Sequence, residues 1–553
     1  MQLYSLQDMK KRLFVVLTGL TLMFSPLMAQ NDFEIAKNVD IFVSILKELN
    51  EKYADEISPG QLTKTAIDAM LESLDPYTVF YPESEIEDYR MMTTGQYGGV
   101  GALIMQRGTD VVISEPYDNS PSAKAGVRAG DIIRKVNGQT VEGKKSSDVS
   151  TAMKGQPGST LVLEVYRPSE NKNITFNIVR EEIKLPNIPY SGMLDAQIGY
   201  IKLDQFTDKA GSEVREAFLK LKEEGMKYLI LDLRNNGGGL LNEAVNIVNL
   251  FVDKGVTIVE TKGKIPEQQR VFKTPTGATD KNIPIVVLVN EHSASASEIV
   301  SGAIQDLDRG VIVGKKSFGK GLVQNVLPLD YNTSLKITVS KYYIPSGRCV
   351  QNIDYFNHDT TKAYKIPDSL AVAFKTKNGR TVYDKGGVEP DVLTEDSLLS
   401  NILFTLVSKN LIFDFANDYR AKHESILPAD QFKIDDQLYA EFVDFLKDKD
   451  ISYKSETEEE LERLKKKAEE EKVFASIEPY YTQLLNELQE EKKNDLQKFK
   501  AEICNYLSSE IVVRYYFQKG RIMNLLSEDP DIATAKSILL DSQRYNSILS
   551  PKK

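Results

Sequence analysis

Residues 283–307 read IPIVVLVNEHSASASEIVSGAIQDL, and this stretch decides the fold class. The apolar run before Asn290 is typical of a buried strand, and the apolar residues after Ser297 recur at the spacing of a helix face. A patch of serine and alanine joins the two. The sequence therefore predicts a strand that turns sharply into a helix, and such turns lie at the end of a sheet, where α/β folds bind their ligands.

The same pairing of strand and helix occurs twice before this stretch. GYIKLDQF, from Gly199, precedes SEVREAFLKLKEEG, and YLILDLR, from Tyr228, precedes LLNEAVNIVNLFV. Strands that alternate with helices predict an α/β core, which we place at residues 184–394.

Three other regions differ from this core in pattern. Residues 30–94 are predicted to be an N-terminal helical segment, because NVDIFVSILKEL places its apolar residues on one face. Residues 95–183 alternate short strands with glycine turns, which predicts a small β domain. Residues 395–553 are predicted to be mostly helical, with a dense run of both charge signs from Glu456. That region is either a solvated helical appendage or an arm for dimerisation or adaptor docking.

Composition narrows the classes of function. A chain of 553 residues exceeds one ordinary core, so about two to four domains are expected. The net charge of −11 argues against a general nucleic-acid binder, which is usually basic. Few metal-binding or disulfide-forming side chains are present, namely Cys349, Cys504, His292, His358 and His423. We therefore predict no metal and no cofactor.

The N-terminus is typical of a secretory signal. The basic run KKR at 10–12 precedes LFVVLTGLTLMFSPLMA, which ends at Ala29. This pattern predicts a signal peptide over 1–29 and a protein that works in the periplasm or elsewhere outside the cytoplasm. The alternative is an uncleaved anchor, which would keep the protein close to a membrane.

The turn within the opening stretch holds three serines. Ser295 and Glu298 fit the capping-box pattern, so a structural role for the serine is the first alternative. The competing interpretation is a nucleophile, with the N–H of Ala296 as an oxyanion donor, as in nucleophile elbows. Ser293 and Ser297 are then predicted to cap or hydrogen-bond the turn.

A second strand also ends in a turn that could take part. LDLRNNGGGLL, from Leu231, contains Gly237, Gly238 and Gly239, which let backbone come close to a ligand. An N–H group of this turn could be the second oxyanion donor. A phosphate cradle is the alternative, but the string matches neither GxGxxG nor Walker A.

A nucleophilic serine needs a base. His292 precedes the turn, and the other histidines lie in polar contexts. Lysine can replace histidine if burial lowers its pKa from about 10.4 to about 7–8. KKSFGKGLVQ, from Lys315, offers Lys320 between two glycines, and Gln324 four residues later could orient the amine.

Taken together, SASASE, FGKG with its lysine 25 positions after the middle serine, and the later glutamine resemble the C-terminal processing peptidases, also called tail-specific proteases. The resemblance covers roughly residues 40–350. It implies a crotonase/ClpP-like peptidase core in which Ser295 is the nucleophile, Lys320 is the general base and Gln324 orients the lysine. His292 is the next candidate for the base.

The resemblance also implies an oxyanion hole. It is formed by the N–H groups of Ala296 and of a glycine in the second turn, for which we choose Gly238. Many relatives have proline where this chain has Gly237, so the neighbouring glycine is the alternative.

GQYGGVGALI and SPSAKAGVRAGDIIRKVNGQTV resemble a PDZ domain, which the same family carries before its catalytic core. The backbone N–H groups of Gly99, Val100 and Gly101 would receive a peptide's terminal carboxylate, and the strand ALIM would pair with the peptide. Arg167 matches an arginine that contacts the protease core in relatives.

The sequence thus predicts a multidomain α/β protein that acts as a serine endopeptidase on proteins with apolar C-termini. Two alternatives stay open, a catalytically inactive PDZ adaptor and a crotonase-type acyl-thioester enzyme. The C-terminal helices are predicted to support an adaptor contact or a homo-oligomer, and no nucleic acid is expected as a partner.

Overall fold

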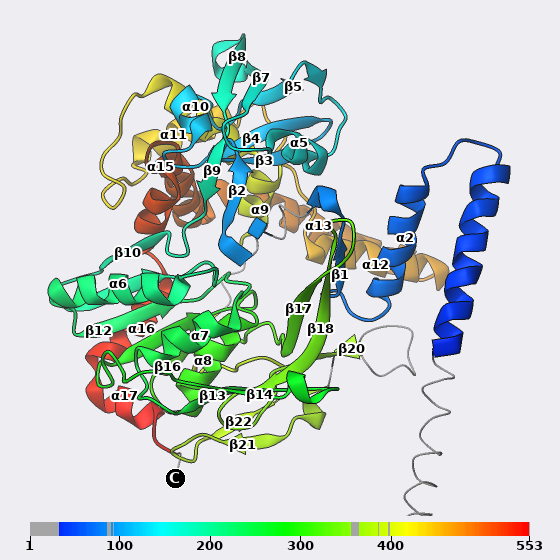
Figure 1. The fold of residues 1–553 in the computed structure, drawn as a ribbon. Helices are drawn as coiled ribbons and strands as arrows, with labels where there is room; N and C mark the ends of the chain where they lie inside the picture. The colour runs from blue at the N-terminus through cyan, green and yellow to red at the C-terminus, as the bar shows by residue number, and fades with distance from the viewer. Residues whose placement is uncertain are drawn as a thin grey trace, which may run out of the picture. The chain divides into compact units, whose positions relative to one another are not determined.

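The computed structural model describes residues 32–85, 90–91, 93–355, 364–365, 367–384, 386–395 and 399–551 (Figure 1). The predicted signal peptide and His358 lie outside these ranges. The chain divides into one unit over Met1–Phe80 and a second over Tyr81–Lys553.

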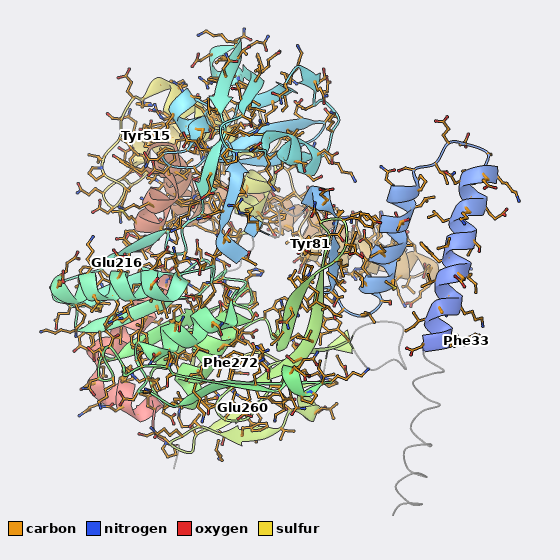
Figure 2. All side chains as sticks on the ribbon, in the orientation of Figure 1. Phe33, Tyr81, Glu216, Glu260, Phe272 and Tyr515 are labelled. Atoms are coloured by element: carbon orange, nitrogen blue, oxygen red, sulfur yellow. The ribbon has the colours of Figure 1, made fainter. Side chains whose placement is uncertain are left out.

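The described part of the first unit, from residue 32 onward, is mostly helical. Residues 32–52 form one helix, and α2 (Pro59–Glu72) follows with Ser58 as its N-cap. The first helix exposes large apolar side chains, and Figure 2 labels Phe33, which is 65% exposed. In the part of the chain that the structure describes, no helix is both long and apolar enough to cross a bilayer.

The second unit begins with a β domain whose antiparallel sheet wraps around one apolar core. In sheet order its strands are β3 (Ala102–Arg107), β4 (Asp110–Pro116), β5 (Ile132–Val136), β7 (Thr160–Arg167) and β8 (Lys172–Val179), with β6 (Gln139–Thr140) beside β5. Two helices accompany them, α4 (Pro121–Ala125) and α5 (Ser146–Met153). The chain enters and leaves through the paired strands β2 (Gln96–Gly99) and β9 (Glu181–Lys184), as expected of an inserted domain.

The α/β core is built on a six-stranded sheet. Its strands, in order, are β10 (Tyr190–Met193), β11 (Ile198–Lys202), β12 (Tyr228–Asp232), β15 (Ile285–Val289), β16 (Val311–Gly314) and β23 (Val392–Leu393). Every pair from β11 onward is parallel, while β10 runs antiparallel to β11. The middle strands are apolar throughout because helices cover both faces of a parallel sheet.

One face of this sheet carries α6 (Ala210–Glu223), α7 (Leu241–Asn249) and α8 (Ala296–Asp306). A second, antiparallel sheet joins the core through β13 (Thr257–Gly263), β14 (Arg270–Lys273), β17 (Leu322–Pro328) and β18 (Ser334–Tyr343). Short pairs follow, β19 (Ile353–Asp354) with β20 (Tyr364–Lys365) and β21 (Ala373–Lys375) with β22 (Thr381–Tyr383). The multidomain α/β fold predicted from the sequence is confirmed.

The C-terminal region is helical but is not one solvated appendage. A separate apolar core joins α9 (Asn401–Ser408), α10 (Leu411–Lys422), α11 (Asp436–Phe445) and α15 (Lys500–Leu525). The charged run forms a hairpin of α12 (Glu456–Glu470) and α13 (Phe474–Lys493), followed by the short α14 (Asp495–Lys498). The last helices, α16 (Pro530–Leu540) and α17 (Ser542–Ile548), pack on the remaining face of the six-stranded sheet.

Candidate active site

Three adjacent parallel strands deliver the predicted site residues to one edge of the sheet. β12 runs into the glycine turn, β15 runs into the serine turn, and β16 runs into the loop that holds Lys320. The carboxyl ends of parallel strands meet at the same edge, so segments far apart in sequence come together there.

The serine turn has the geometry of a nucleophile elbow. Ser295 lies between the end of β15 and the start of α8, with φ 55° and ψ −111°. A positive φ is uncommon for a residue with a side chain, and such strain is concentrated at functional sites. The turn holds the serine side chain at the end of the sheet, as in the strand-to-helix elbows of hydrolases.

The three serines of the turn differ in what their hydroxyls do. Ser293 Oγ donates to the carbonyl of Leu233 at 2.9 Å, and Ser297 Oγ donates to the carbonyl of Asn236 at 2.9 Å. Both flanking serines are buried and tie the elbow to the glycine turn. Ser295 is partly buried, and its hydroxyl makes no capping hydrogen bond. Of the three, the middle serine is the one available for chemistry.

Glu298 joins the elbow to the lysine loop. Its Oε2 accepts hydrogen bonds from the backbone N–H of Ser295 at 2.9 Å and of Lys320 at 2.8 Å. Its Oε1 accepts from the Gly319 N–H at 2.7 Å and from the Ser317 hydroxyl at 2.5 Å. The carboxyl is fully buried, and desolvation raises its pKa against the lowering effect of these hydrogen bonds. The sequence predicts only a helix cap here, because the Ser317–Lys320 contacts are tertiary.

The lysine loop is fixed on both sides of Lys320. The Phe318 N–H donates to the carbonyl of Ser293 at 3.0 Å, and the Gly321 N–H donates to Gln351 Oε1 at 2.7 Å. The Lys320 side chain is partly buried. The backbone N–H groups of Lys320 and Ser295 both donate to Glu298 Oε2, so the two backbones lie close together.

Gln324 lies on β17, the strand that leaves this loop. Its Nε2 donates to Thr338 Oγ1 on β18 at 3.2 Å. Its Oε1 accepts no hydrogen bond from any described residue.

The glycine turn lies directly against the elbow. A Cβ on Gly238 would stand 2.6 Å from the carbonyl oxygen of Ala294 and 2.8 Å from the nitrogen of Ala296, so no side chain fits. The Gly238 N–H donates to Asn236 Oδ1 at 2.9 Å, whereas the N–H groups of Gly237 and Gly239 donate to no described residue. The structure therefore places the chosen glycine at the elbow but directs its N–H to a side chain.

Ala296 is the first residue of α8, and the N–H groups of a first turn have no acceptor within their helix. Its N–H donates to no described residue.

Behind the glycine turn lies a buried charge cluster that the sequence analysis missed. Burial tends to raise the pKa of Asp232, but Arg234 and Lys202 hold it at about 2. The Tyr200 hydroxyl also donates to Asp232 Oδ2 at 2.8 Å. The string LDLR shows the two alternating charges at the end of an apolar strand, and this was the available signal.

Neither of the two described histidines lies in this arrangement. His292 is exposed, and its ring faces Glu291 at 3.9 Å. The His423 ring stacks on Tyr419 at 4.0 Å in the helical region. Among the described residues, no group of three or more histidine, cysteine, aspartate or glutamate side chains could hold a metal ion.

The β domain presents the predicted carboxylate-binding loop at the start of β3. Gly101 has φ 74°, its carbonyl accepts the N–H of Tyr117 at 2.9 Å, and the carbonyl of Val100 accepts the N–H of Ser122 at 2.9 Å. Gly99 ends β2. β3 is the edge strand of its sheet, and α5 lies beside it. An edge strand has unpaired backbone groups to which an extended peptide can add.

Arg167 makes its hydrogen bonds at the end of β7. Its Nε and Nη2 donate to the two carboxylate oxygens of Asp131 at 2.7 and 2.8 Å, and Nη2 also donates to the carbonyl of Gly126 at 2.8 Å. The side chain is 7% exposed. In the described structure its hydrogen bonds stay within the β domain, since a bidentate carboxylate there already satisfies the guanidinium.

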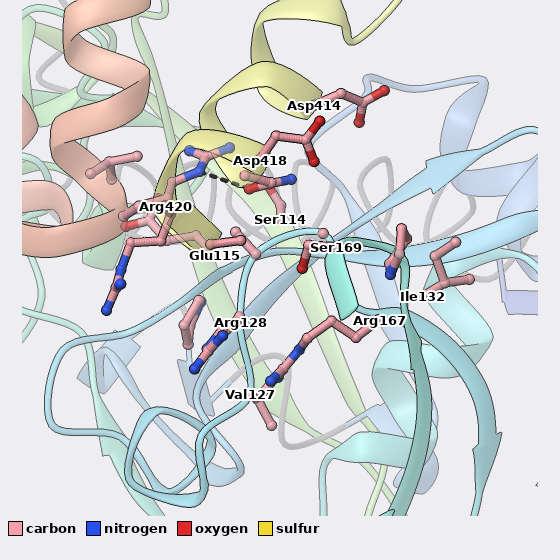
Figure 3. A pocket seen from close by; sticks show the side chains of 18 of the residues that line it. Ser114, Glu115, Val127, Arg128, Ile132, Arg167, Ser169, Asp414, Asp418 and Arg420 are labelled. Atoms are coloured by element: carbon pink, nitrogen blue, oxygen red, sulfur yellow. Dashed lines mark hydrogen bonds between the residues drawn. The ribbon is translucent and has the colours of Figure 1, made fainter. Parts of the chain in front are cut away.

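A cavity of about 740 Å³ lies elsewhere, between the β domain and helices α10 and α15 (Figure 3). Arg107 and Asp414 line it and form a bidentate ion pair with distances of 2.7 and 2.6 Å. None of its lining residues belongs to the serine, lysine or glycine turns.

Comparison with known proteins identifies three stretches of the chain. Residues 197–359 match peptidase family S41, residues 112–167 match a PDZ domain, and residues 402–539 match the C-terminal helical domain of probable PDZ-proteases. A carboxy-terminal-processing protease of Bartonella bacilliformis is 36% identical over 339 residues, which are 61% of this chain and 77% of that protein.

Two further proteins are similar to this chain. A probable CtpA-like serine protease of Staphylococcus aureus is 35% identical over 377 residues, with 63% of this chain and 75% of that protein covered. The solved photosystem II D1 C-terminal processing protease is 28% identical, with 65% of this chain and 93% of that chain covered and a TM-score of 0.35.

Proposed function

Because the chain belongs to the carboxy-terminal-processing protease family and is a serine-type peptidase with a PDZ domain, we propose that Ser295 and Lys320 form its catalytic dyad. One observation carries this assignment. A single buried carboxylate, that of Glu298, accepts hydrogen bonds from the backbone N–H groups of both residues, and the middle hydroxyl of the elbow makes no capping hydrogen bond.

The proposed reaction is acyl transfer to the serine. Ser295 Oγ attacks the carbonyl carbon of the scissile peptide bond while Lys320 Nζ, in its neutral form, takes the hydroxyl proton. The negatively charged oxygen of the tetrahedral intermediate accepts hydrogen bonds from the backbone N–H groups of Ala296 and of the glycine turn. Lys320 then gives its proton to the leaving amine. The Lys320 amine, neutral again, takes a proton from a water molecule, and this water hydrolyses the acyl-enzyme.

Gln324 is proposed to hold the lysine amine in place. Its amide nitrogen donates to Thr338, which orients the side chain and leaves the carbonyl oxygen to accept from Lys320. In the glycine turn, we propose that the second oxyanion donor is Gly238 after its N–H leaves Asn236, or the neighbouring Gly237, whose N–H has no acceptor among the described residues.

We further propose that the PDZ domain, at residues 95–183, captures apolar C-terminal tails for the core at 184–394. The loop at Gly99–Gly101 would bind the terminal carboxylate, and β3 would pair with the tail. The basic and apolar N-terminal pattern supports extracytoplasmic substrates.

The test is cleavage of an unfolded reporter that ends in an apolar tail. We expect the wild-type chain to cut it, Ser295→Ala not to cut it, and Lys320→Ala to bind the tail without cutting. Equal cutting by wild type and Lys320→Ala would show that lysine is not the base. Tail binding without cutting by the wild type would instead identify an adaptor, and hydrolysis of a coenzyme A ester would identify a thioester enzyme.

A further inference from the structure

The last two described helices pack against the sheet whose strands lead to the proposed catalytic residues. α16 and α17 cover the face of the six-stranded sheet opposite α6, α7 and α8, and Figure 1 shows them in red beside it. Apolar side chains of α16 and α17 pack on apolar residues of four strands, and the helix residues are Ile532, Ala535, Ile538, Leu539 and Tyr545. These helices therefore cover the second face of the sheet, and parallel sheets are normally covered by helices on both faces.

The N-terminus of α16 adds a charged contact to this packing. Arg234 Nη1 lies 3.1 Å from Asp529 Oδ1 and 2.9 Å from Asp531 Oδ2, and its Nη2 lies 2.8 Å from Asp529 Oδ2. Asp529 is also the N-cap of α16 and accepts the N–H groups of Asp531 at 2.9 Å and Ile532 at 3.1 Å. One carboxylate thus caps the helix and holds an arginine of the core.

Arg234 stands at the entrance to the glycine turn. Its Nη2 donates to Asp232 Oδ2 at 2.6 Å, so the guanidinium bridges the end of β12 and the start of α16. Two residues later, the carbonyl of Asn236 accepts the N–H of Ala294 at 3.0 Å, and its side chain holds the N–H of Gly238. The position of Arg234 therefore sets where the glycine turn meets the elbow.

We propose that Asp529 and Asp531 are positioning residues for catalysis, through Arg234, and that docking of α16 completes the oxyanion hole. This inference rests on the proposed function, because it assumes that the glycine turn supplies a donor to the tetrahedral intermediate. Small displacements of such a donor are costly, since about 1 Å of misplacement can lower a rate by about a hundred-fold.

The test is Asp529→Asn in the full chain. Asparagine caps helices about as well as aspartate, so this change removes the charge that holds Arg234 and keeps the cap. We expect kcat for the tailed reporter to fall about ten-fold or more, with KM changed less than about two-fold. Affinity for a peptide boronic acid, whose tetrahedral adduct occupies the oxyanion hole, should fall in parallel, and tail binding to the PDZ domain should stay the same.

Lys536→Gln is the matched control. Lys536 also lies on α16 and pairs with Asp195 at 2.9 Å, but at the turn between β10 and β11. We expect it to keep wild-type kcat, and Asp529→Glu to recover most of the activity. Thermal melting of each variant separates misplacement from unfolding, and Asp531→Asn provides a second variant should Asp529→Asn fail to fold.

Three results would overturn the inference. The first is wild-type kcat in a folded Asp529→Asn or Asp531→Asn chain, and the second is an equal loss in Lys536→Gln. The third is a loss of kcat without loss of boronic acid affinity. If the wild-type chain itself does not cut the reporter, it is the proposed function that fails, whereas a cutting wild type with an equally active Asp529→Asn variant refutes this inference alone.

Discussion

At the residue scale, the carboxylate of Glu298 holds the serine elbow and the lysine loop together. It accepts four hydrogen bonds while fully buried, and these bonds offset part of the cost of removing a carboxylate from water. Because all four donors belong to the elbow or the lysine loop, the side chain keeps Ser295 and Lys320 in register. The S-x-x-E pattern alone predicts only the bond to the serine N–H, since the other three come from a loop about twenty residues away.

A pH prediction follows from Asp232, whose pKa is held at about 2 by Arg234 and Lys202. The folded pKa lies below the unfolded value, so this carboxylate contributes stability above pH 4, and the contribution is lost as pH falls toward 2. The shift corresponds to about 2 kcal/mol. Free energies of unfolding measured from pH 6 to pH 2 should show the gap between wild type and Asp232→Asn narrowing by about that amount. A gap that stays constant with pH would contradict the assignment.

At the element scale, the sequence predicts local units well and their partners poorly. The run IPIVVLVN and the helix after it are where the apolar pattern places them, as β15 and α8. The apolar face of α16, with Ile532, Ala535 and Leu539, is also visible in the sequence. That this face covers the six-stranded sheet cannot be predicted from the sequence, because the partner strands lie hundreds of residues earlier and any apolar surface could bury the same helix face.

The loop before β3 supports a prediction of its own. Gly101 has φ 74°, and a Cβ there would stand 2.5 Å from the Cβ of Ser120, so Gly101→Ala should distort the carboxylate loop. We expect KM for a reporter with an apolar tail to rise about ten-fold, while cleavage of a short internal peptide is unchanged. Gly108→Ala is the control, because Gly108 also has a positive φ of 60° but faces open space in the β3–β4 turn. A similar rise in KM for both variants would show a general effect of strain in the PDZ domain.

At the scale of the whole molecule, the helical region contacts two different domains. α16 and α17 pack on the peptidase sheet, and α10 and α15 pack on the PDZ domain. The second contact includes Gln518, whose Nε2 donates to the buried Glu115 at 2.8 Å. Sequence composition indicates a helical region but not this double contact, because its polar parts are single pairs between distant residues.

The ion pair between Arg107 and Asp414 allows the contribution of the second contact to stability to be measured. Arg107 and Asp414 have side chains 39% and 31% exposed, so solvent weakens the pair. A double-mutant cycle with Arg107→Ala and Asp414→Ala should give a coupling energy of about 0.5–1 kcal/mol, measured by urea unfolding. Each single variant should also speed hydrogen exchange in β4 and α10. A coupling energy of zero would show that the two domains are held together by their other contacts.

The placement of α16 and α17 also has a consequence for the order of synthesis. A ribosome makes residues 530–549 after every residue of the proposed dyad, the glycine turn and the PDZ domain, so a growing chain carries a sheet with one uncovered apolar face. Until residues 529–531 have been made, Arg234, just after β12, lacks the two aspartates that bind it. The six-stranded sheet therefore gains its second helical layer only after the residues of the proposed dyad have been made.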